Sequence, residues 1–307
     1  MSAAPKTIAI VGSGALGSYY GAKLARQGAD VRFLMRADLE AVRRDGLTVR
    51  EKGEEWHVPA QAFGSTGEIG PVDLVVIGLK TTANADLERL IPPLLHEKTL
   101  LLTLQNGLGN EELLARQWGA ERVLGGLCFV CLNRVAPGVI EHYGHGTLSL
   151  GEFGRAPMER TQAIGAMFSH AGVETHVVEN LITERWRKLV WNIPFNGLSI
   201  ATGGSTCDQL LADEGVKAQV RALMLETIAA AGALGHAIPE NFADYQIERT
   251  YSMGPYKPSS MIDWQLGRAV EVESIWGEPW RQGNAAGVAL PRLELLYRLL
   301  QQLTQQT

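Results

Sequence analysis

Residues 7–28 read TIAIVGSGALGSYYGAKLARQG, and this stretch decides the fold. Its first five residues form an apolar run typical of a short buried strand, and residues 12–17 follow at once in the pattern G-x-G-x-x-G. A helical run from Ser18 to Gln27 comes next and ends at Gly28. A strand, a glycine-rich turn and a helix in this order predict a unit that holds the pyrophosphate of a dinucleotide.

Three glycines of this turn have separate physical roles. Gly12 permits the tight turn after the strand, Gly14 lets the backbone approach a pyrophosphate, and Gly17 lets the helix pack closely on the strand. The helix N-terminus adds free N–H groups and the positive end of the helix dipole. We therefore expect the cofactor to contact the whole turn, which consists of Gly12, Ser13, Gly14, Ala15, Leu16 and Gly17. The alternative is a glycine-rich turn that binds no ligand.

The end of the second strand, at residues 30–35, indicates which nucleotide binds. NAD-binding proteins place Asp or Glu about 20 residues beyond the glycines, where the carboxylate accepts from the ribose 2′-OH. Arg36 stands in that neighbourhood, and a guanidinium pairs with a 2′-phosphate. Asp38 is expected to cap the next helix instead. The sequence therefore predicts NADP(H) rather than NAD, the alternative being that Arg36 is only a surface residue.

Two polar residues follow buried strands later in this half of the chain. We expect further strands at residues 47–50, 56–58, 72–79, 99–104, 122–132 and 173–177, and helices at 82–95, 111–117 and 158–171. Lys80 and Asn106 follow two of these strands, and ligands of such sheets bind at the carboxyl ends of the strands. Residues 137–147 are expected to form a hairpin. His142 and His145 lie in it without a carboxylate pattern nearby, which argues against a catalytic role.

Residues 184–196 read ERWRKLVWNIPFN and predict a helix with a polar stripe. Lys188, Asn192 and Asn196 recur every four residues and share one face, whereas the other faces are mostly apolar. A buried ammonium and two buried carboxamides are costly unless each has a partner. Pro194 removes one helical N–H and is expected to kink the helix. The stripe predicts a wall of a polar cleft; the alternative is that Lys188 reaches solvent and the Asn residues lie at a rim.

From residue 181 onward the sequence predicts only helices, at residues 181–201, 214–234, 240–252, 259–268, 271–286 and 291–306. We therefore expect an α/β domain at residues 1–179, with a Rossmann-type doubly wound sheet that binds NADP, and an all-α domain at residues 180–307 that binds the substrate. The helix that carries the polar stripe opens the second domain, and clefts at domain junctions are common ligand sites.

Composition excludes several classes of function. The formal charge of −5 at pH 7 argues against nucleic acid as a partner. No apolar run reaches the roughly 18 residues of a membrane span, and residues 1–6 lack the pattern of a signal peptide. Cys128, Cys131 and Cys207 form no disulfide pattern, and the lone C-x-x-C has no further ligands at the spacing that zinc needs. These features predict a cytoplasmic protein with no metal site and no membrane partner.

Seven short segments, taken in order, resemble those of the ketopantoate reductases (2-dehydropantoate 2-reductases), which are NADPH-dependent enzymes of pantothenate synthesis. The segments are residues 12–17 (GSGALG), Leu79-Lys80, 105–107 (QNG), 137–140 (PGVI), 186–189 (WRKL) with Asn192 and Asn196, 259–261 (SSM) and 267–271 (GRAVE). The resemblance spans essentially the whole chain. It implies a helical domain like the C-terminal domain of 6-phosphogluconate dehydrogenase, a small-molecule 2-oxo acid as substrate, and a homodimer as one allowed assembly.

The resemblance also implies a role for each candidate residue. Lys188 is the general acid that protonates the carbonyl oxygen of the substrate, and Glu271 completes the catalytic site beside the cofactor. The substrate's carboxylate and hydroxyl are held by Asn192, Asn196 and Ser260. NADP(H) is held by the glycine-rich turn together with Arg36, Lys80, Asn106, Cys131 and Glu271. Elementary chemistry agrees, because hydride delivery to a ketone leaves an alkoxide that a lysine ammonium can stabilise and protonate.

Two departures from the family pattern leave alternatives open. The segment between Met261 and Gly267 is one residue shorter than is common, so Glu273 competes with Glu271 for the role of site carboxylate. Residues 206–210 read TCDQL, where the family often has an Asn-Gly-Glu-Leu segment that touches substrate. Another 2-oxo acid is therefore an alternative substrate. A non-catalytic NADP-binding sensor is the alternative class, although such a protein is expected to lose Lys188 or Glu271.

Overall fold

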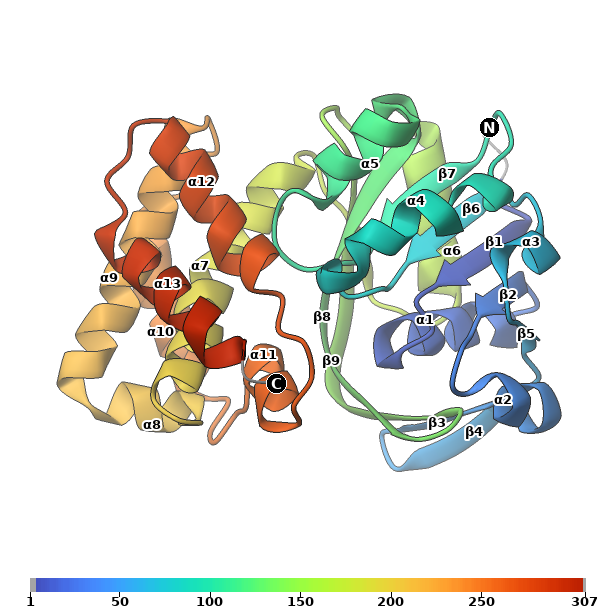
Figure 1. Cartoon of the computed structure of the whole chain (residues 1–307), viewed down its shortest axis with the longest axis horizontal. Coiled ribbons are helices and arrows are strands. Elements are labelled where there is room, and N and C mark those ends of the chain that lie inside the picture. The colour runs from blue at the N-terminus through green and yellow to red at the C-terminus, as the bar shows by residue number, and fades with distance from the viewer. Residues whose placement is uncertain (1–3, 306–307) are drawn as a thin grey trace. The chain divides into compact units, whose positions relative to one another are not determined.

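The computed structural model describes residues 4–305, and Figure 1 shows how the secondary-structure elements follow one another. The described residues form two compact units. The first comprises the residues up to Gln105 together with Asn110–Leu181, and the second comprises Asn106–Gly109 together with the residues from Ile182 onward. The short loop Asn106–Gly109 therefore belongs to the second unit although both of its flanks belong to the first. The sequence did not predict this division.

The first unit is built on one ten-stranded sheet. Its strands are β1 (Thr7–Val11), β2 (Asp30–Leu34), β3 (Leu47–Glu51), β4 (Glu54–Val58), β5 (Gln61–Phe63), β6 (Leu74–Ile77), β7 (Leu100–Thr103), β8 (Val123–Ala136), β9 (Val139–Glu152) and β10 (Thr175–Val177). They run in the order β4-β3-β9-β8-β7-β6-β1-β2-β5, with β10 paired to β9. The strands from β5 to β8 along this order are parallel, and central strands such as β6 are buried over their whole length.

Helices of the first unit differ from the prediction in one place. They are α1 (Ala15–Arg26), α2 (Leu39–Asp45), α3 (Thr66–Ile69), α4 (Leu87–Leu90), α5 (Asn110–Trp118) and α6 (Glu159–His170), with 3₁₀ segments η1 (Thr81–Asp86), η2 (Pro92–Leu94) and η3 (Ala120–Arg122). The single helix predicted over residues 82–95 is wrong, because η1, α4 and η2 divide this stretch. Ala83 has non-helical dihedral angles, and the Pro92–Pro93 pair lacks the N–H groups that would continue α4.

Asp38 and the hairpin at residues 137–147 also differ from expectation. Asp38 precedes α2 but its side chain caps no N–H of that helix; its carboxylate instead accepts from Arg134 (2.9 Å) and from the backbone N–H of Gly138 (3.2 Å). The hairpin turn lies at Pro137–Gly138, where Gly138 has φ +71°, and the antiparallel strands β8 and β9 extend far beyond the predicted range. A two-residue turn with a positive φ fits the twist of the flanking strands.

The second unit is helical. Its elements are α7 (Leu181–Ala201), α8 (Cys207–Ala212), α9 (Glu214–Ala233), α10 (Asn241–Tyr251), α11 (Ser259–Gln265), the π-helix η4 (Glu273–Gly277), α12 (Glu278–Ala285) and α13 (Pro291–Thr304). The sequence reading missed α8, although Thr206 and Gln209 form the capping box that marks its start. It also predicted one helix over residues 271–286, where η4 and α12 meet in different helical registers. None of the helices among residues 4–305 is long and apolar enough to cross a membrane.

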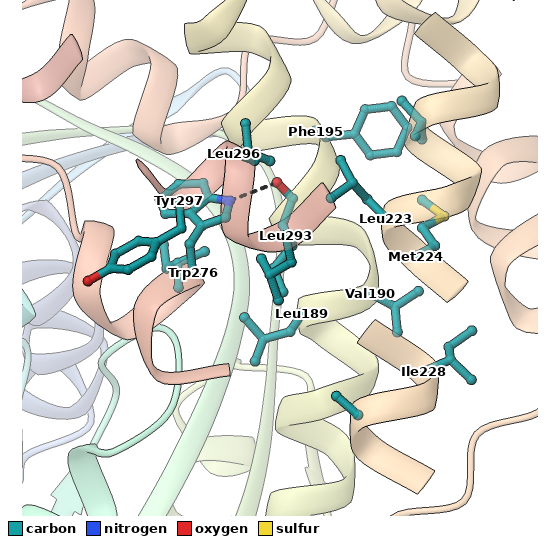
Figure 2. Packing of buried hydrophobic residues seen from close by; sticks show 14 of the residues in the cluster. Leu189, Val190, Phe195, Leu223, Met224, Ile228, Trp276, Leu293, Leu296 and Tyr297 are labelled. Carbon is teal, nitrogen blue, oxygen red and sulfur yellow. Dashed lines mark hydrogen bonds between the residues drawn. The ribbon is translucent and has the colours of Figure 1, made fainter. Parts of the chain in front are cut away.

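Buried side chains of α7 organise the core of this unit (Figure 2). Leu189, Val190 and Phe195 pack against buried residues of α9, η4 and α13. The indole N–H of Trp276, in η4, donates to the backbone carbonyl of Ile193 (2.9 Å). Helix α7 continues through Pro194 to Ala201. Its apolar faces are thereby fixed, so its polar stripe has a defined direction.

Candidate functional site

The glycine-rich turn between β1 and α1 has the geometry that a bound pyrophosphate requires. Gly12 has φ +102°, and a Cβ there would overlap the backbone of Leu79. A Cβ at Gly17 would overlap the carbonyl oxygen of Gly12, so both positions exclude larger residues. A Cβ at Gly14 would meet no atom within 4 Å. The turn is therefore closed toward the protein and open at Gly14, beside the N-terminus of α1, which fits a dinucleotide phosphate.

Arg36 lies exposed just after β2, where the predicted 2′-phosphate would bind. Its guanidinium forms no hydrogen bond or ion pair with any residue between 4 and 305. Its backbone carbonyl accepts from Leu39 and so fixes the start of α2. A cationic side chain with no protein partner, at the ribose end of such a site, fits a phosphate group.

Lys80 and Gln105 follow the carboxyl ends of β6 and β7, and an amide network joins these two segments. The side chain of Gln105 donates to Asn84 (2.7 Å), and Asn84 donates to Asn110 (3.1 Å). The hydroxyl of Thr103 donates to the Gln105 carbonyl oxygen (3.0 Å). Sequence reasoning missed Asn84 and Thr103, which no motif singles out. Their bonds fix both ends of the loop Asn106–Gly109.

Within the second unit, Lys188 of α7 contacts the loop that carries Asn106. The ammonium nitrogen Nζ of Lys188 donates to Oδ1 of Asn106 (2.8 Å), and Lys188 is half-buried. The sequence reading assigned Asn106 to the cofactor and did not predict this bond. The contact orients the ammonium with a neutral acceptor, which leaves its positive charge intact.

The two Asn residues of the stripe differ in their partners. Asn196 is 2% exposed, and its carboxamide accepts from the backbone N–H of Ser260 (2.9 Å) and donates to the carbonyl of Asn192 (3.2 Å). The carboxamide of Asn192, a residue 9% exposed, forms no hydrogen bond to any residue between 4 and 305. The same is true of the hydroxyl of Ser260, which is 4% exposed. Two nearly buried polar groups without protein partners indicate a place for a polar ligand.

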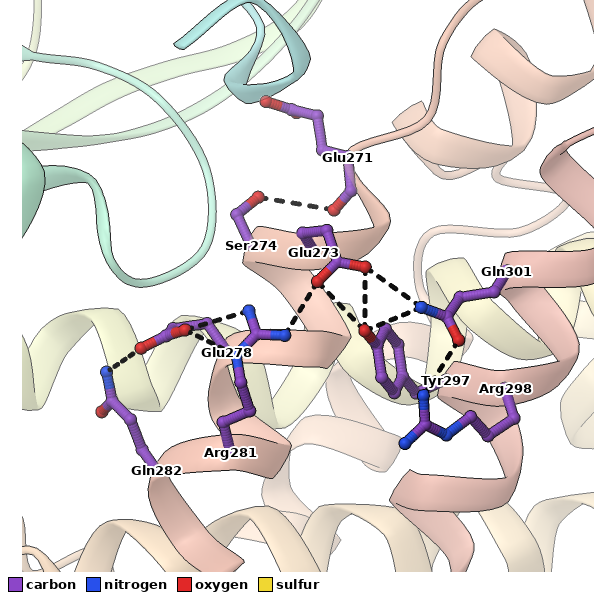
Figure 3. Close-up of polar contacts among 9 residues, drawn as sticks. All are labelled: Glu271, Glu273, Ser274, Glu278, Arg281, Gln282, Tyr297, Arg298 and Gln301. Carbon is purple, nitrogen blue, oxygen red and sulfur yellow. Dashed lines mark hydrogen bonds and ion pairs between the residues drawn. The ribbon is translucent and has the colours of Figure 1, made fainter. Parts of the chain in front are cut away.

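Glu271 and Glu273 have different surroundings (Figure 3). The carboxylate of Glu273 accepts from Tyr297 (2.8 Å), from Arg281 (2.8 Å) and from Gln301 (3.3 Å). Burial tends to raise its pKa, but the bonds from these three side chains outweigh that and lower the pKa. The side chain of Glu271 points away from this network. Glu273 is thus engaged in joining η4 to α12 and α13.

Other sequence candidates lie in ordinary structural positions. Cys131 is a half-buried residue of β8 that pairs with Gly144 of β9. His142 packs against Tyr19 and lies beside the carboxylate of Glu51. No group of three or more His, Cys, Asp or Glu side chains suited to a metal ion occurs in the described part of the chain.

Comparison with known proteins identifies the family. Residues 8–155 match the family described as ketopantoate reductase PanE/ApbA, and residues 180–304 match ketopantoate reductase PanE/ApbA C terminal. The chain belongs to the ketopantoate reductase family. The predicted resemblance and the predicted fold class, a Rossmann-type α/β half followed by a helical half, are both confirmed.

Individual ketopantoate reductases resemble the chain over nearly its whole length. A 2-dehydropantoate 2-reductase of Nostoc sp. is 42% identical, over 95% of this chain and 93% of that protein. The crystal structure of 2-dehydropantoate 2-reductase from Geobacter metallireducens is 47% identical with a TM-score of 0.93, covering 96% of this chain and 99% of that one. The corresponding structure from Methylococcus capsulatus is 34% identical with a TM-score of 0.91, covering 98% and 97%.

Proposed function

We propose that this protein reduces 2-dehydropantoate (ketopantoate) at C2 to pantoate with NADPH, a step of pantothenate and coenzyme A biosynthesis. The observation that carries the proposal is the pair of nearly buried, unpartnered groups, the Asn192 carboxamide and the Ser260 hydroxyl, in the unit that also holds Lys188. Buried polar groups without protein partners are costly unless a ligand satisfies them. Relatives that match nearly the whole chain carry the name of this activity.

The first unit supplies the cofactor site. When bound, NADPH supplies the hydride. The turn from Gly12 to Gly17 offers backbone N–H groups and space at Gly14 for the phosphates. Arg36 would pair with the 2′-phosphate and so select NADP(H) over NAD(H). Lys80, at the carboxyl end of β6, and the backbone near Cys131 are further proposed contacts.

Lys188 acts as the general acid. Addition of hydride to C2 of the ketone places negative charge on the C2 oxygen, and the Lys188 ammonium stabilises this charge and donates a proton to the oxygen. Asn106 accepts one N–H of the ammonium, which leaves the other two directed elsewhere. In the proposed site Glu271 is the carboxylate, since Glu273 is held by Arg281 and Tyr297.

Three side chains recognise the substrate. The Asn192 carboxamide and the Ser260 hydroxyl would bind its carboxylate and its 4-hydroxyl without adding charge. Asn196 was predicted to bind substrate directly. Its two bonds to the backbone at Ser260 and Asn192 favour a role in placing Ser260 as well.

One departure from the family pattern concerns the substrate. Cys207 stands in the segment where relatives often have Asn, and it is fully buried. Burial raises the pKa of its thiol to about 12, so the group is an inert part of the core. Another 2-oxo acid is therefore the second candidate substrate.

The decisive experiment compares ketopantoate with 2-oxoisovalerate, which lacks the hydroxymethyl group, at the same NADPH concentration. We expect a kcat/KM at least a hundredfold higher for ketopantoate, because a site built to bind a hydroxyl rejects an analogue without it. If 2-oxoisovalerate matches ketopantoate, only the reductase class survives. If neither 2-oxo acid is reduced although NADPH binds, the non-catalytic sensor is the better description. The homodimer and the cytoplasmic location stay predictions; light scattering tests the first, against a chain mass of 33.4 kDa.

A further inference from the structure

The π-helix η4 directly follows Glu271, and its register leaves one backbone carbonyl open. In η4 the N–H of Glu278 donates to the carbonyl of Glu273, five residues earlier, where an α-helix would use Ser274. The residue five positions after Ser274 is Pro279, which has no N–H. The next helical donor in either register is therefore missing or already engaged. Sequence and register together free the carbonyl of Ser274 for a partner outside the helix.

That partner is the loop that holds Asn106. The backbone N–H of Leu108 donates to the carbonyl oxygen of Ser274 (2.9 Å). Gly107 packs so closely on Ser274 that a Cβ would overlap its carbonyl group, and its φ of +82° also favours glycine. Asn106 precedes these two residues and accepts from Lys188. The open carbonyl of η4 thus fixes the loop that holds the acceptor of the Lys188 ammonium.

Two further bonds attach other parts of the candidate site to the same five residues. The indole of Trp276 donates to the carbonyl of Ile193 on α7, the helix that carries Lys188. At the start of η4, the N–H of Ile275 (3.2 Å) and the hydroxyl of Ser274 (3.4 Å) both donate to the backbone carbonyl of Glu271. An α-helical register would rotate these side chains by about 100° per residue shifted and break this arrangement. Short π-helical segments are frequently found at functional sites.

We propose that Pro279 and the π-helix before it are positioning elements of the reaction: they keep the Ser274 carbonyl open for Leu108, and so hold Asn106 against Lys188. This inference rests on the proposed role of Lys188 as the general acid. Pro279 touches neither substrate nor cofactor in this account. It acts only through the backbone of Ser274 and the loop Asn106–Gly109.

The test is Pro279→Ala, which returns an N–H that competes for the Ser274 carbonyl. We expect kcat with ketopantoate to fall about ten- to a hundredfold, as for a misplaced catalytic group. The alkaline limb of the kcat–pH profile should move to lower pH, because a lost acceptor disfavours the ammonium form. The dissociation constant of NADPH should change less than twofold. Pro291→Ala, at the first position of α13 where a missing N–H has no consequence, is the matched control.

A double-mutant cycle separates positioning from general damage. Asn106→Ala should shift the pH profile in the same direction, and adding Pro279→Ala to it should lower kcat by less than a further twofold, since both act through one contact. Gly107→Ala attacks the contact from the loop side and should reproduce the shift. Additive losses, or a loss of kcat with an unchanged pH profile, would overturn the proposal.

A second measurement does not depend on turnover. In the unmodified protein the amide of Leu108 is protected by its bond to Ser274, so Pro279→Ala should accelerate hydrogen exchange in the peptide that spans residues 104–110 at least tenfold. Pro291→Ala should leave that exchange unchanged. Unaltered protection in Pro279→Ala would disprove the structural half of the inference. Absence of 2-oxo acid reduction in the unmodified protein, with exchange behaving as expected, would instead reject the proposed function alone.

Discussion

Lys188 donates a hydrogen bond from Nζ to Oδ1 of Asn106, a residue 82 positions earlier in the chain. The acceptor is a neutral carboxamide, so it orients the ammonium without pairing its charge. A carboxylate in the same place would stabilise the charged form and make proton release harder. The pair therefore suits a lysine that gives a proton to an oxygen gaining negative charge.

The first prediction follows from that contact. Lys188→Ala should remain folded and bind NADPH, yet lose roughly a hundredfold or more in kcat, which is the usual contribution of a general acid. Steady-state oxidation of NADPH with ketopantoate measures the loss. Lys217→Ala, which removes a lysine from the surface of α9, is the control and should keep normal turnover. Near-normal kcat in Lys188→Ala would reject the assignment, whatever happens to KM.

Arg36 carries the second prediction. Its guanidinium has no partner between residues 4 and 305, so Arg36→Ala should cost about 1.5–3 kcal/mol in NADPH binding, typical of a charged hydrogen bond, and little in NADH binding. Titration of protein fluorescence with each cofactor measures both affinities. Arg44→Ala serves as control, because Arg44 is exposed and already paired with Asp45. Equal affinity of the unmodified protein for NADPH and NADH would contradict the idea.

Sequence periodicity predicts the main features of this site but not their internal division of roles. The predicted helix over residues 181–201 coincides with α7, since seven or more turns of regular pattern leave little ambiguity. Four-residue spacing places Asn192 and Asn196 on one face, yet only the fold shows that Asn196 is bonded to Ser260, 64 positions away. Propensity cannot supply such a long-range partner. The π-helix was likewise beyond prediction, because its open carbonyl is satisfied by Leu108, far away in the sequence.

The two Asn residues give the third prediction. Asn192→Ala should raise KM for ketopantoate about tenfold or more and leave the melting temperature nearly unchanged, because the lost bond is to a charged ligand and not to protein. Asn196→Ala should lower the melting temperature as well, because it leaves the buried N–H of Ser260 without its acceptor. Differential scanning calorimetry and initial rates distinguish the two. A normal KM in Asn192→Ala would remove Asn192 from the substrate site.

The fourth prediction separates Glu271 from Glu273. Glu271→Gln should lower kcat/KM at least tenfold with little change in stability. Glu273→Gln should retain activity and lose about 1 kcal/mol of stability, a modest value because the pair with Arg281 is largely exposed. Rates and thermal unfolding of both variants decide the matter. The opposite pattern, with activity lost only in Glu273→Gln, would move the catalytic role to Glu273.

The last prediction concerns stability against acid in the first unit. The carboxylate of Glu51 accepts from Lys23 (2.6 Å), Trp56 (2.8 Å) and Tyr19 (3.0 Å), and the Lys23 and Glu51 side chains are about nine-tenths buried. Burial alone would raise the pKa of Glu51, but the bond from Lys23 and those from Trp56 and Tyr19 together lower it below the usual 4.5. A carboxylate whose pKa is lowered by folding stabilises the protein above its usual value. That contribution is lost as pH falls through the lowered one.

Glu51→Gln should therefore destabilise the protein by about 2–4 kcal/mol at pH 7, because it leaves the buried Lys23 ammonium without its counter-charge. Below pH 4.5 the difference between the variant and the unmodified protein should shrink, since the native carboxyl then takes up a proton as well. Thermal unfolding followed by circular dichroism at pH 7 and at pH 3.5 measures both. Glu55→Gln, which removes an exposed partner of Arg50 on the neighbouring strand β4, is the control and should change stability by less than about 1 kcal/mol at either pH. A difference for Glu51→Gln that stays constant from pH 7 to pH 3.5 would show that the loss comes from packing and not from the charge of Glu51.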